Sequence, residues 1–242
     1  MDADIIAQLA PSGTLRAGLN MANKLLNTSE TAAGDPDGVA ADMARAIAEK
    51  LGVGVSLIRF ASPGELADEV SNDIWDIGFI GAEPTRAETI DFTAAYVEIE
   101  ATYLVAEDSR FQTVEDVDSD GVRIAVSGRS AYDLYLSRNL KNAELIRAQG
   151  VPGAVDLFKT GDYDALAALR PALVAEIDDL PGTRILDDRF TAVQQAIGTQ
   201  KGKEKATKFL SDFVEEAKAS GFVASLIEKH GVVGRLSVAQ PG

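Results

Sequence analysis

The sequence DIWDIGFIGAEPTRAETIDFTAAY occupies residues 73–96 and decides the fold that we predict for this chain. Its apolar run at 77–80 predicts a buried strand, and the run ends at Gly81 in a polar turn. The turn carries Glu83 and Arg86, so charge lies at the carboxyl end of the predicted strand. Small ligands bind at that end of open α/β sheets, and an arginine fork with adjacent backbone N–H groups suits a carboxylate.

The rest of the chain alternates strand-like and helix-like segments. Residues 14–19 and 53–59 predict strands, and residues 39–51 predict a helix with one apolar stripe that Gly52 closes. Ser62 and Pro63 predict the start of a further helix. This alternation is typical of an α/β fold.

The carboxyl-terminal part predicts two more helices. Residues 203–220 place apolar side chains on one helical face, and a last helix is expected from Phe222 to His230. His230, the single histidine, is expected to be a solvated helix terminus, because the helix dipole favours cations there. The tail from Ser237 is expected to fray.

Composition excludes several classes of function. The chain has 242 residues, of which 46% are hydrophobic, enough for a core. Its net charge is -15, and no basic cluster appears, which argues against nucleic acid and anionic membranes as partners. There is no cysteine, and no nucleotide-binding or metal-binding motif occurs, so we predict no cofactor, no metal site and no catalytic residue.

The amino terminus bears on location. Residues 1–9 begin with acidic side chains and hold too few apolar ones for a signal peptide or a membrane span. We therefore expect no export signal in this sequence. Either a signal peptide preceded Met1 in the native protein, or the native protein stays inside the cell.

Three sequence blocks in order resemble one known family. Residues 84–96 contain Pro-x-Arg-Ala-Glu, Ile-Asp-Phe-Thr and a Tyr, and residues 15–18 and 38–52 match the family's opening. The resemblance is to the polar amino-acid type of periplasmic solute-binding protein. It implies a type II periplasmic binding protein fold, with two three-layer α/β lobes joined by two hinge strands. The first lobe would be discontinuous, with residues 1–99 and 191–242, and the second would hold residues 100–190.

The function that this resemblance implies is binding without catalysis. The chain would be the substrate-binding component of an ABC importer and would close its lobes on a small polar ligand that bears a carboxylate, an amino acid or a related organic acid. It would dock on the permease transmembrane subunits as a monomer in the periplasm, with the cytoplasm as the alternative. Two rival functions stay open: a dehydratase-like enzyme with Glu83 as general acid, and a cytoplasmic ligand sensor.

In the first lobe we predict five ligand-binding residues, and the resemblance implies the role of Arg86. Arg86 would grip the carboxylate beside Gly81, and a structural ion pair with Asp91 or Glu88 is the competing interpretation. Asn20 and Asn23 stand where the family usually has an acidic residue and an aromatic lid. Glu83 replaces the usual Thr and would suit an ammonium group.

In the second lobe the candidates are Arg129, Ser130 and Arg170. Residues 121–131 match the family's strand followed by Gly-Ser/Thr-Thr, which places Ser130 at a helix N-cap. Its hydroxyl and the first free N–H groups could accept an anion, although an ordinary cap explains it equally well. Arg170 lies where amino-acid binders commonly have an Asp for the ammonium group. It would favour a ligand with two anionic groups, whereas Glu83 would favour a zwitterion.

Overall fold

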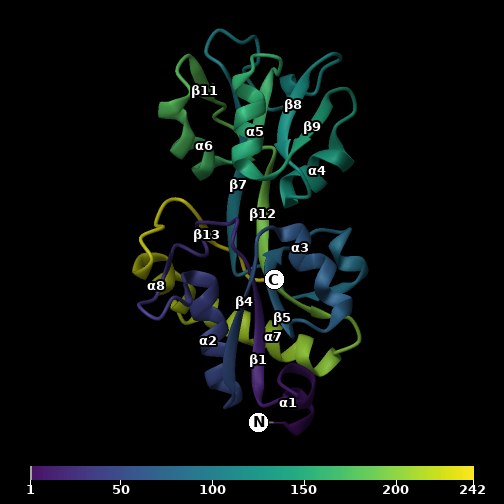
Figure 1. Cartoon of the computed structure of the whole chain (residues 1–242), viewed down its shortest axis with the longest axis vertical. Coiled ribbons are helices and arrows are strands. Elements are labelled where there is room, and N and C mark those ends of the chain that lie inside the picture. Colours follow the sequence, from purple (N-terminus) through teal and green to yellow (C-terminus); the bar gives the residue numbers. More distant parts are fainter. Residues whose placement is uncertain (1) are drawn as a thin grey trace. The chain divides into compact units, whose positions relative to one another are not determined.

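The computed structural model describes residues 2–242, which form two compact α/β units (Figure 1). Unit 1 contains residues 2–98 and 194–242, and unit 2 contains residues 99–193. Two strands, β7 (Val97–Ala106) and β12 (Thr191–Gln200), each have residues in both units and connect them. The predicted α/β class is confirmed.

Unit 1 is built around parallel strands. β1 pairs in parallel with β4 and with β5, and β12 pairs antiparallel with β5. Short strand β6 lies against β12, and β13 pairs with β7. The helices are α1 (Ala3–Leu9), α2 (Val39–Leu51), α3 (Pro63–Asp68), α7 (Glu204–Ala219) and α8 (Phe222–Lys229), with 3-10 turns η1 (Glu69–Asn72) and η2 (Arg86–Glu88). The strands are β1 (Thr14–Asn20), β2 (Ser29–Glu30), β3 (Pro36–Asp37), β4 (Gly54–Phe60), β5 (Ile77–Gly81), β6 (Ile90–Phe92) and β13 (Ser237–Val238).

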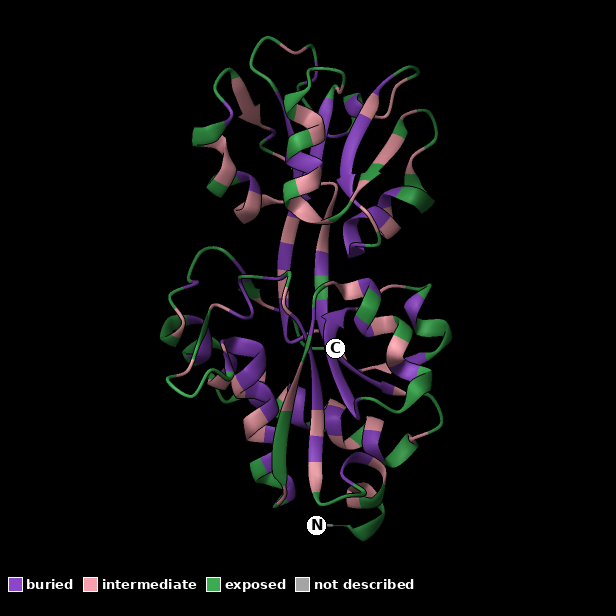
Figure 2. Ribbon diagram, in the orientation of Figure 1, coloured by how far each residue is buried: buried purple, intermediate pink, exposed green. Residues whose placement is uncertain are grey.

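Burial in unit 1 follows the position of each strand in the sheet. Every residue of β5 is buried, whereas β4, at the sheet edge, is mostly exposed (Figure 2). A central parallel strand is covered on both faces and therefore needs a continuous apolar run. Helix α2 buries its apolar face and ends at Gly52, whose φ of 75° gives the left-handed cap that the sequence predicts. Ser62 caps α3 by accepting from the Glu65 N–H, and Pro63 follows it.

Gly38 fixes how the loop after β1 packs on helix α2. Its φ is +146°, and an added Cβ would lie 2.3 Å from the Leu26 carbonyl oxygen. The same oxygen accepts a hydrogen bond from the Ala40 N–H at 3.1 Å. Only glycine therefore allows the loop to approach the start of α2 this closely.

Unit 2 repeats the plan with other strands. β8 pairs in parallel with β9 and β10, and β7 pairs antiparallel with β10 and β11. Its core includes Tyr103, and the partly buried Phe190 packs against it with ring centroids 4.7 Å apart. The helices are α4 (Ala131–Asn139), α5 (Gly150–Lys159) and α6 (Arg170–Glu176), with 3-10 turns η3 (Glu115–Val117) and η4 (Ile177–Asp179). The strands are β8 (Arg123–Ser127), β9 (Glu144–Ala148), β10 (Ala165–Leu169) and β11 (Thr183–Ile185).

Two predictions about the carboxyl-terminal part are wrong. The His230 side chain is 5% exposed and lies 2.8 Å from the Asp42 carboxylate, because α8 packs on α2. The tail forms β13 against β7, and the Gln240 carbonyl accepts from Lys218 at 2.9 Å. Tertiary contacts hold both segments.

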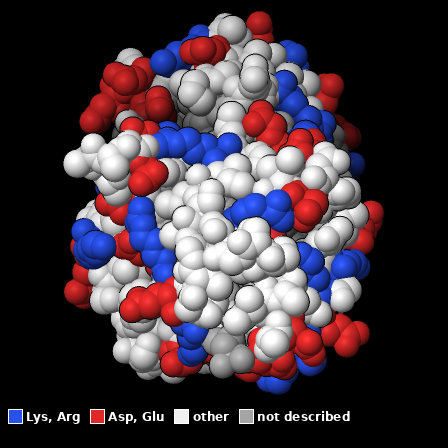
Figure 3. Space-filling view, turned by 60° about the horizontal axis from the view of Figure 1, so that its bottom comes forward, with Lys and Arg blue, Asp and Glu red and all other residues white. Residues whose placement is uncertain are grey.

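The surface mixes charges of both signs. On the face shown in Figure 3, acidic and basic side chains are interspersed with uncharged surface. Such mixing on that face lacks the single-sign field that steers a polyanion. Within residues 2–242, no helix combines the length and the apolar character that a bilayer crossing needs.

Candidate functional site

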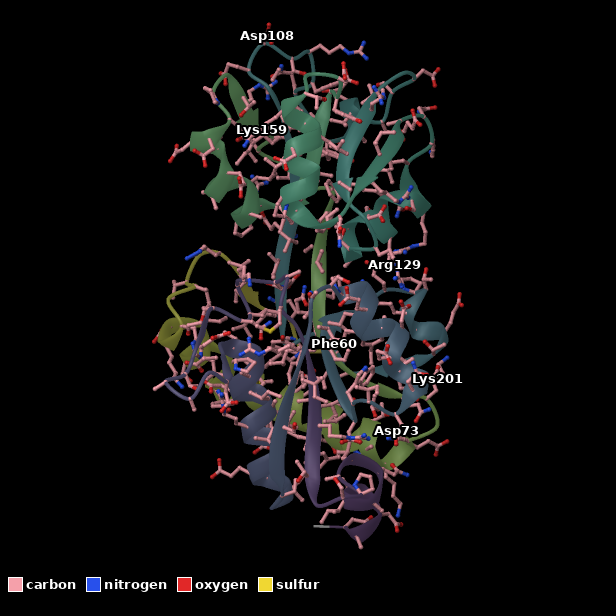
Figure 4. All side chains as sticks on the ribbon, in the orientation of Figure 1. Phe60, Asp73, Asp108, Arg129, Lys159 and Lys201 are labelled. Atoms are coloured by element: carbon pink, nitrogen blue, oxygen red, sulfur yellow. The ribbon has the colours of Figure 1, made fainter. Side chains whose placement is uncertain are left out.

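The carboxyl ends of three neighbouring strands meet at one edge of unit 1. β1 runs beside β4 up to Asn20 and Phe60, and beside β5 up to Leu19 and Phe79. Figure 4 labels Phe60 at the end of β4. Ligands of open α/β sheets bind outside such strand ends, so this edge is the first candidate site.

Arg86 lies just beyond β5, in the 3-10 turn η2. The residue is 6% exposed, and its Nη1 donates to the Gly81 carbonyl at 2.7 Å. Asp91, one of the competing ion-pair partners, accepts from the Gly202 N–H at 3.3 Å. A guanidinium held in a dry position forms strong charge-assisted bonds, so Arg86 has the placement that a carboxylate grip needs.

In the turn between Gly81 and Arg86, fewer backbone groups can bind a ligand than the sequence suggests, because several already form hydrogen bonds within the protein. Ala82 already donates its N–H to the Gln194 carbonyl at 2.8 Å. Glu83 is half-buried, and its carbonyl accepts from the Ala87 N–H at 2.9 Å. The turn is therefore fixed by its own hydrogen bonds, with the Glu83 carboxylate near the carboxyl end of β5.

The loop after β1 is organised by three buried asparagines. The Asn20 Oδ1 accepts from the Ala22 N–H at 3.2 Å, and the Asn23 Oδ1 accepts from the Leu25 N–H at 3.1 Å. Both side chains thus close Asx-turns, which gives them a loop-shaping role beside the predicted ligand role.

Asn27 is a residue that the sequence analysis missed. It is 4% exposed, and its Nδ2 donates to the Asn20 carbonyl at 2.9 Å. Its Oδ1 is buried and has no hydrogen-bond partner in the described structure. The signal available in the sequence was the recurrence of Asn at 20, 23 and 27, in the loop after the first strand.

In unit 2, the predicted N-cap role of Ser130 is confirmed. Its Oγ accepts from the Asp133 N–H at 3.1 Å at the start of α4. Arg129, labelled in Figure 4, precedes it with an exposed side chain and a φ of 60°. Burial raises the pKa of Tyr132 to about 12, while hydrogen bonds with Ser130 and Ser127 act in the opposite direction. Three hydroxyls therefore gather at this helix start.

A carboxylate of the protein already lies at the start of α4. The Asp133 side chain is 3% exposed, accepts from the Arg129 N–H at 2.7 Å and pairs with the Arg147 Nε at 3.0 Å. A ligand carboxylate near Ser130 would lie close to this negative charge. The second-carboxylate role of Ser130 stays a prediction, and the geometry weighs against it.

Arg170 is occupied within unit 2. Its Nε pairs with the Glu100 carboxylate at 2.8 Å, and its other nitrogens donate to the carbonyls of Leu186, Asp187 and Asp188. These partners hold the segment after β11 against the start of α6. The geometry therefore supports a structural brace in place of the predicted contact with a ligand.

One group of side chains in the described residues has metal-ligand chemistry. Asp37, Asp42 and His230 offer donor atoms within 4.8 Å of one another. However, Arg45 bonds both carboxylates, at 3.2 and 2.8 Å, and Lys229 bonds Asp42 at 2.7 Å. Side-chain cations already neutralise this group, which joins α2 to α8.

Comparison with known proteins decides the family. The family model for bacterial extracellular solute-binding proteins, family 3, matches residues 15–233. The chain belongs to this family. The resemblance drawn from the sequence is thereby confirmed.

Individual relatives and a solved structure agree with this. The chain is 21% identical over 230 residues to the ABC transporter glutamine-binding protein GlnH of Bacillus subtilis, covering 93% of this chain and 84% of GlnH. It is 30% identical over 148 residues to a cyclohexadienyl dehydratase of Pseudomonas aeruginosa, covering 55% of each. The solved structure of the amino acid ABC transporter substrate-binding protein AbpA from Streptococcus pneumoniae, bound to L-arginine, superposes with a TM-score of 0.73 at 20% identity, covering 92% of this chain and 96% of AbpA. The two-lobed periplasmic binding protein fold is thus confirmed for this solute-binding protein.

Proposed function

We propose that this solute-binding protein serves an ABC importer and captures a small polar ligand bearing a carboxylate, an amino acid or a related organic acid. The observation that carries the proposal is the buried Arg86 at the carboxyl end of β5. The names of GlnH and AbpA, both from amino-acid ABC transporters, support the same class of ligand. Export from the cytoplasm and docking on permease subunits belong to this proposal.

The energetics require more than one contact. A charge-assisted hydrogen bond contributes about 1.5 to 3 kcal/mol, whereas micromolar affinity corresponds to about 8 kcal/mol. Further polar contacts and apolar burial must therefore add to the Arg86 contact. A ligand that touched both units would favour a closed form, because it would bind that form better than an open one.

The likeness to a dehydratase supports one alternative function, which is enzymatic. It is a partial likeness, since it covers 55% of each chain. A dehydratase would need an acid that protonates a leaving group, and Glu83 is the carboxylate placed nearest the end of β5 in the chain. We propose binding without catalysis, because GlnH and AbpA, which match over 84% and 96% of their own lengths, are both named as binding proteins.

The test uses protein that has been unfolded and refolded to remove any ligand carried through purification. Calorimetric titration with amino acids, dicarboxylates and keto acids should give saturable binding to at least one class. Arg86→Ala should weaken that binding by about 2 to 5 kcal/mol, because the ligand carboxylate loses a dry charged partner. The matched control is Arg235→Ala, an exposed arginine of the same unit, which should leave affinity unchanged.

Two outcomes would contradict the proposal. Full affinity in Arg86→Ala would remove this residue from the site, provided that the variant keeps the wild-type unfolding temperature without ligand. Turnover of a carboxylic acid that stops in Glu83→Gln would establish the enzymatic alternative.

A further inference from the structure

A hollow of about 490 Å³ lies at the carboxyl ends of β1 and β4 in unit 1. Residues of three segments line it: Met21, Lys24 and Asn27 from the loop after β1, Glu30 from β2, and Arg59 and Phe60 from β4. We call it the Lys24 hollow. All of these residues belong to unit 1.

Lys24 is the uncompensated charge of this hollow. Its side chain is exposed, and among residues 2–242 it has neither an ion pair nor a hydrogen bond. The other two charged residues of the lining neutralise each other, since Arg59 Nη1 lies 2.6 Å from the Glu30 carboxylate. The hollow therefore has a net positive charge, in a chain whose net charge is -15.

Asn27 adds a second, independent observation. Within residues 2–242 its Oδ1 is a buried acceptor without a donor, which is uncommon in folded proteins, and the residue belongs to the lining of the hollow. Lys24 has three N–H donors and lines the same hollow. A turn of the Asn27 amide toward the hollow would let one ammonium donate both to the Asn27 oxygen and to an anion, and this would hold the Lys24 side chain in place when a ligand is present.

The hollow lies next to the proposed carboxylate grip. Phe60 and Gly81 end the two strands that flank β1, and Gly81 holds Arg86 through its carbonyl. Neighbouring strands are about 4.8 Å apart, so the hollow and Gly81 are separated by roughly one to two strand spacings. That separation matches the two ends of a short-chain dicarboxylate, with Phe60 and Met21 providing apolar surface for the chain between them.

From these observations we infer that the Lys24 hollow binds a second anionic group of the ligand, so that the substrates are small organic acids with two anionic ends. The inference rests on the proposed function, because it assumes that Arg86 binds the first carboxylate. The sequence analysis predicted the same class of ligand from Arg170. In this inference Lys24 takes the place of Arg170. Among the described residues that line the hollow, the cation without an internal partner is Lys24.

The experiment compares pairs of ligands that differ in one charge. Refolded protein is titrated calorimetrically with glutarate against butyrate, and with L-glutamate against L-glutamine. Wild type should bind the dianionic member of at least one pair roughly tenfold more tightly, as expected for one added charge-assisted contact. Lys24→Gln should abolish that preference, whereas the control Lys201→Gln, an exposed lysine of the same unit labelled in Figure 4, should keep it.

The outcomes separate this inference from the proposed function. If glutarate is preferred but L-glutamate is not, the substrate lacks an ammonium group; if both are preferred, acidic amino acids belong to the class. Preference for the monoanionic member of both pairs, equal affinity within both pairs, or an unchanged preference in Lys24→Gln would overturn the inference while leaving Arg86-dependent binding intact. Absence of binding by any carboxylate would overturn the proposed function and this inference with it.

Discussion

The two units have similar architecture, and at the carboxyl edge of each an arginine bonds a carboxylate of the protein itself, as Arg59 bonds Glu30 in unit 1. In unit 2, Arg147 and Arg170 bond carboxylates of the protein itself, Asp133 and Glu100. Unit 1 differs by Lys24, which is exposed and has neither an ion pair nor a hydrogen bond among the described residues. An arginine near a strand end is thus not by itself a ligand residue. Its availability depends on whether an internal carboxylate neutralises it.

Among the features that differ between the two units, the packing of the loop after β1 in unit 1 should respond most strongly to a single substitution. Gly38→Ala would place a Cβ 2.3 Å from the Leu26 carbonyl oxygen, and should lower the free energy of unfolding by about 2 to 4 kcal/mol. Hydrogen exchange resolved by segment should show lost protection in α2 and in the 20–27 loop, with unit 2 unaffected.

A neighbouring glycine provides the control. Gly34 has a φ of +85°, but nothing lies within 4 Å of an added Cβ. Gly34→Ala should therefore cost only about 1 to 2 kcal/mol from backbone conformation. Equal losses in the two variants would mean that the contact with Leu26 does not shape the site loop.

The Arg170 brace gives the next largest effect and distinguishes the units directly. Arg170→Met should lower the stability of unit 2 by about 1.5 to 3 kcal/mol, because Glu100 and three carbonyls lose a charged donor. Ligand affinity should change by less than about twofold, in contrast to Arg86→Ala. Lost affinity with unimpaired hydrogen-exchange protection in unit 2 would instead return Arg170 to the binding site.

Ser130 should show a smaller effect of the same kind. Ser130→Ala removes the acceptor of the Asp133 N–H and should cost about 1 kcal/mol of stability. Because Asp133 already places a carboxylate there, we expect little change in affinity for a carboxylate ligand. If Ser130→Ala loses much affinity while its stability equals that of Ser130→Thr, this helix start binds a second anionic group.

The smallest expected effect is the loss of stability in acid that comes from the contacts of Asp42 between α2 and α8. Burial acts to raise the pKa of Asp42, but hydrogen bonds from Lys229, His230 and Arg45 together lower it below the ordinary value of 3.8. The folded carboxylate thus binds a proton less readily than the unfolded one, and its stabilisation is present above pH 3.8 and is lost as the pH falls through the lowered pKa. Wild type should be more stable than Asp42→Asn at neutral pH, and the difference should shrink in denaturant titrations below pH 3.8. A difference that stays constant with pH would show that Asp42 acts as a neutral acceptor.

Much of the fold could be predicted because its signals are local. The apolar run of β5, the cap at Gly52, the start of α3 at Pro63 and the cap at Ser130 each depend on neighbours within a few residues. Backbone sterics and capping hydrogen bonds act over that range. Motif order then added the family, which the match over residues 15–233 confirms.

The sequence by itself therefore determined the α/β class, the family and the position of Arg86 after β5. Only the tertiary structure decided which charges are neutralised inside the protein, because their partners are distant in sequence. Arg170 pairs with a residue 70 positions away, and His230 with one 188 positions away. The tertiary structure also showed that, among the described residues, the Asn27 Oδ1 has no donor and Lys24 has no partner, since burial and pairing are properties of the packed chain.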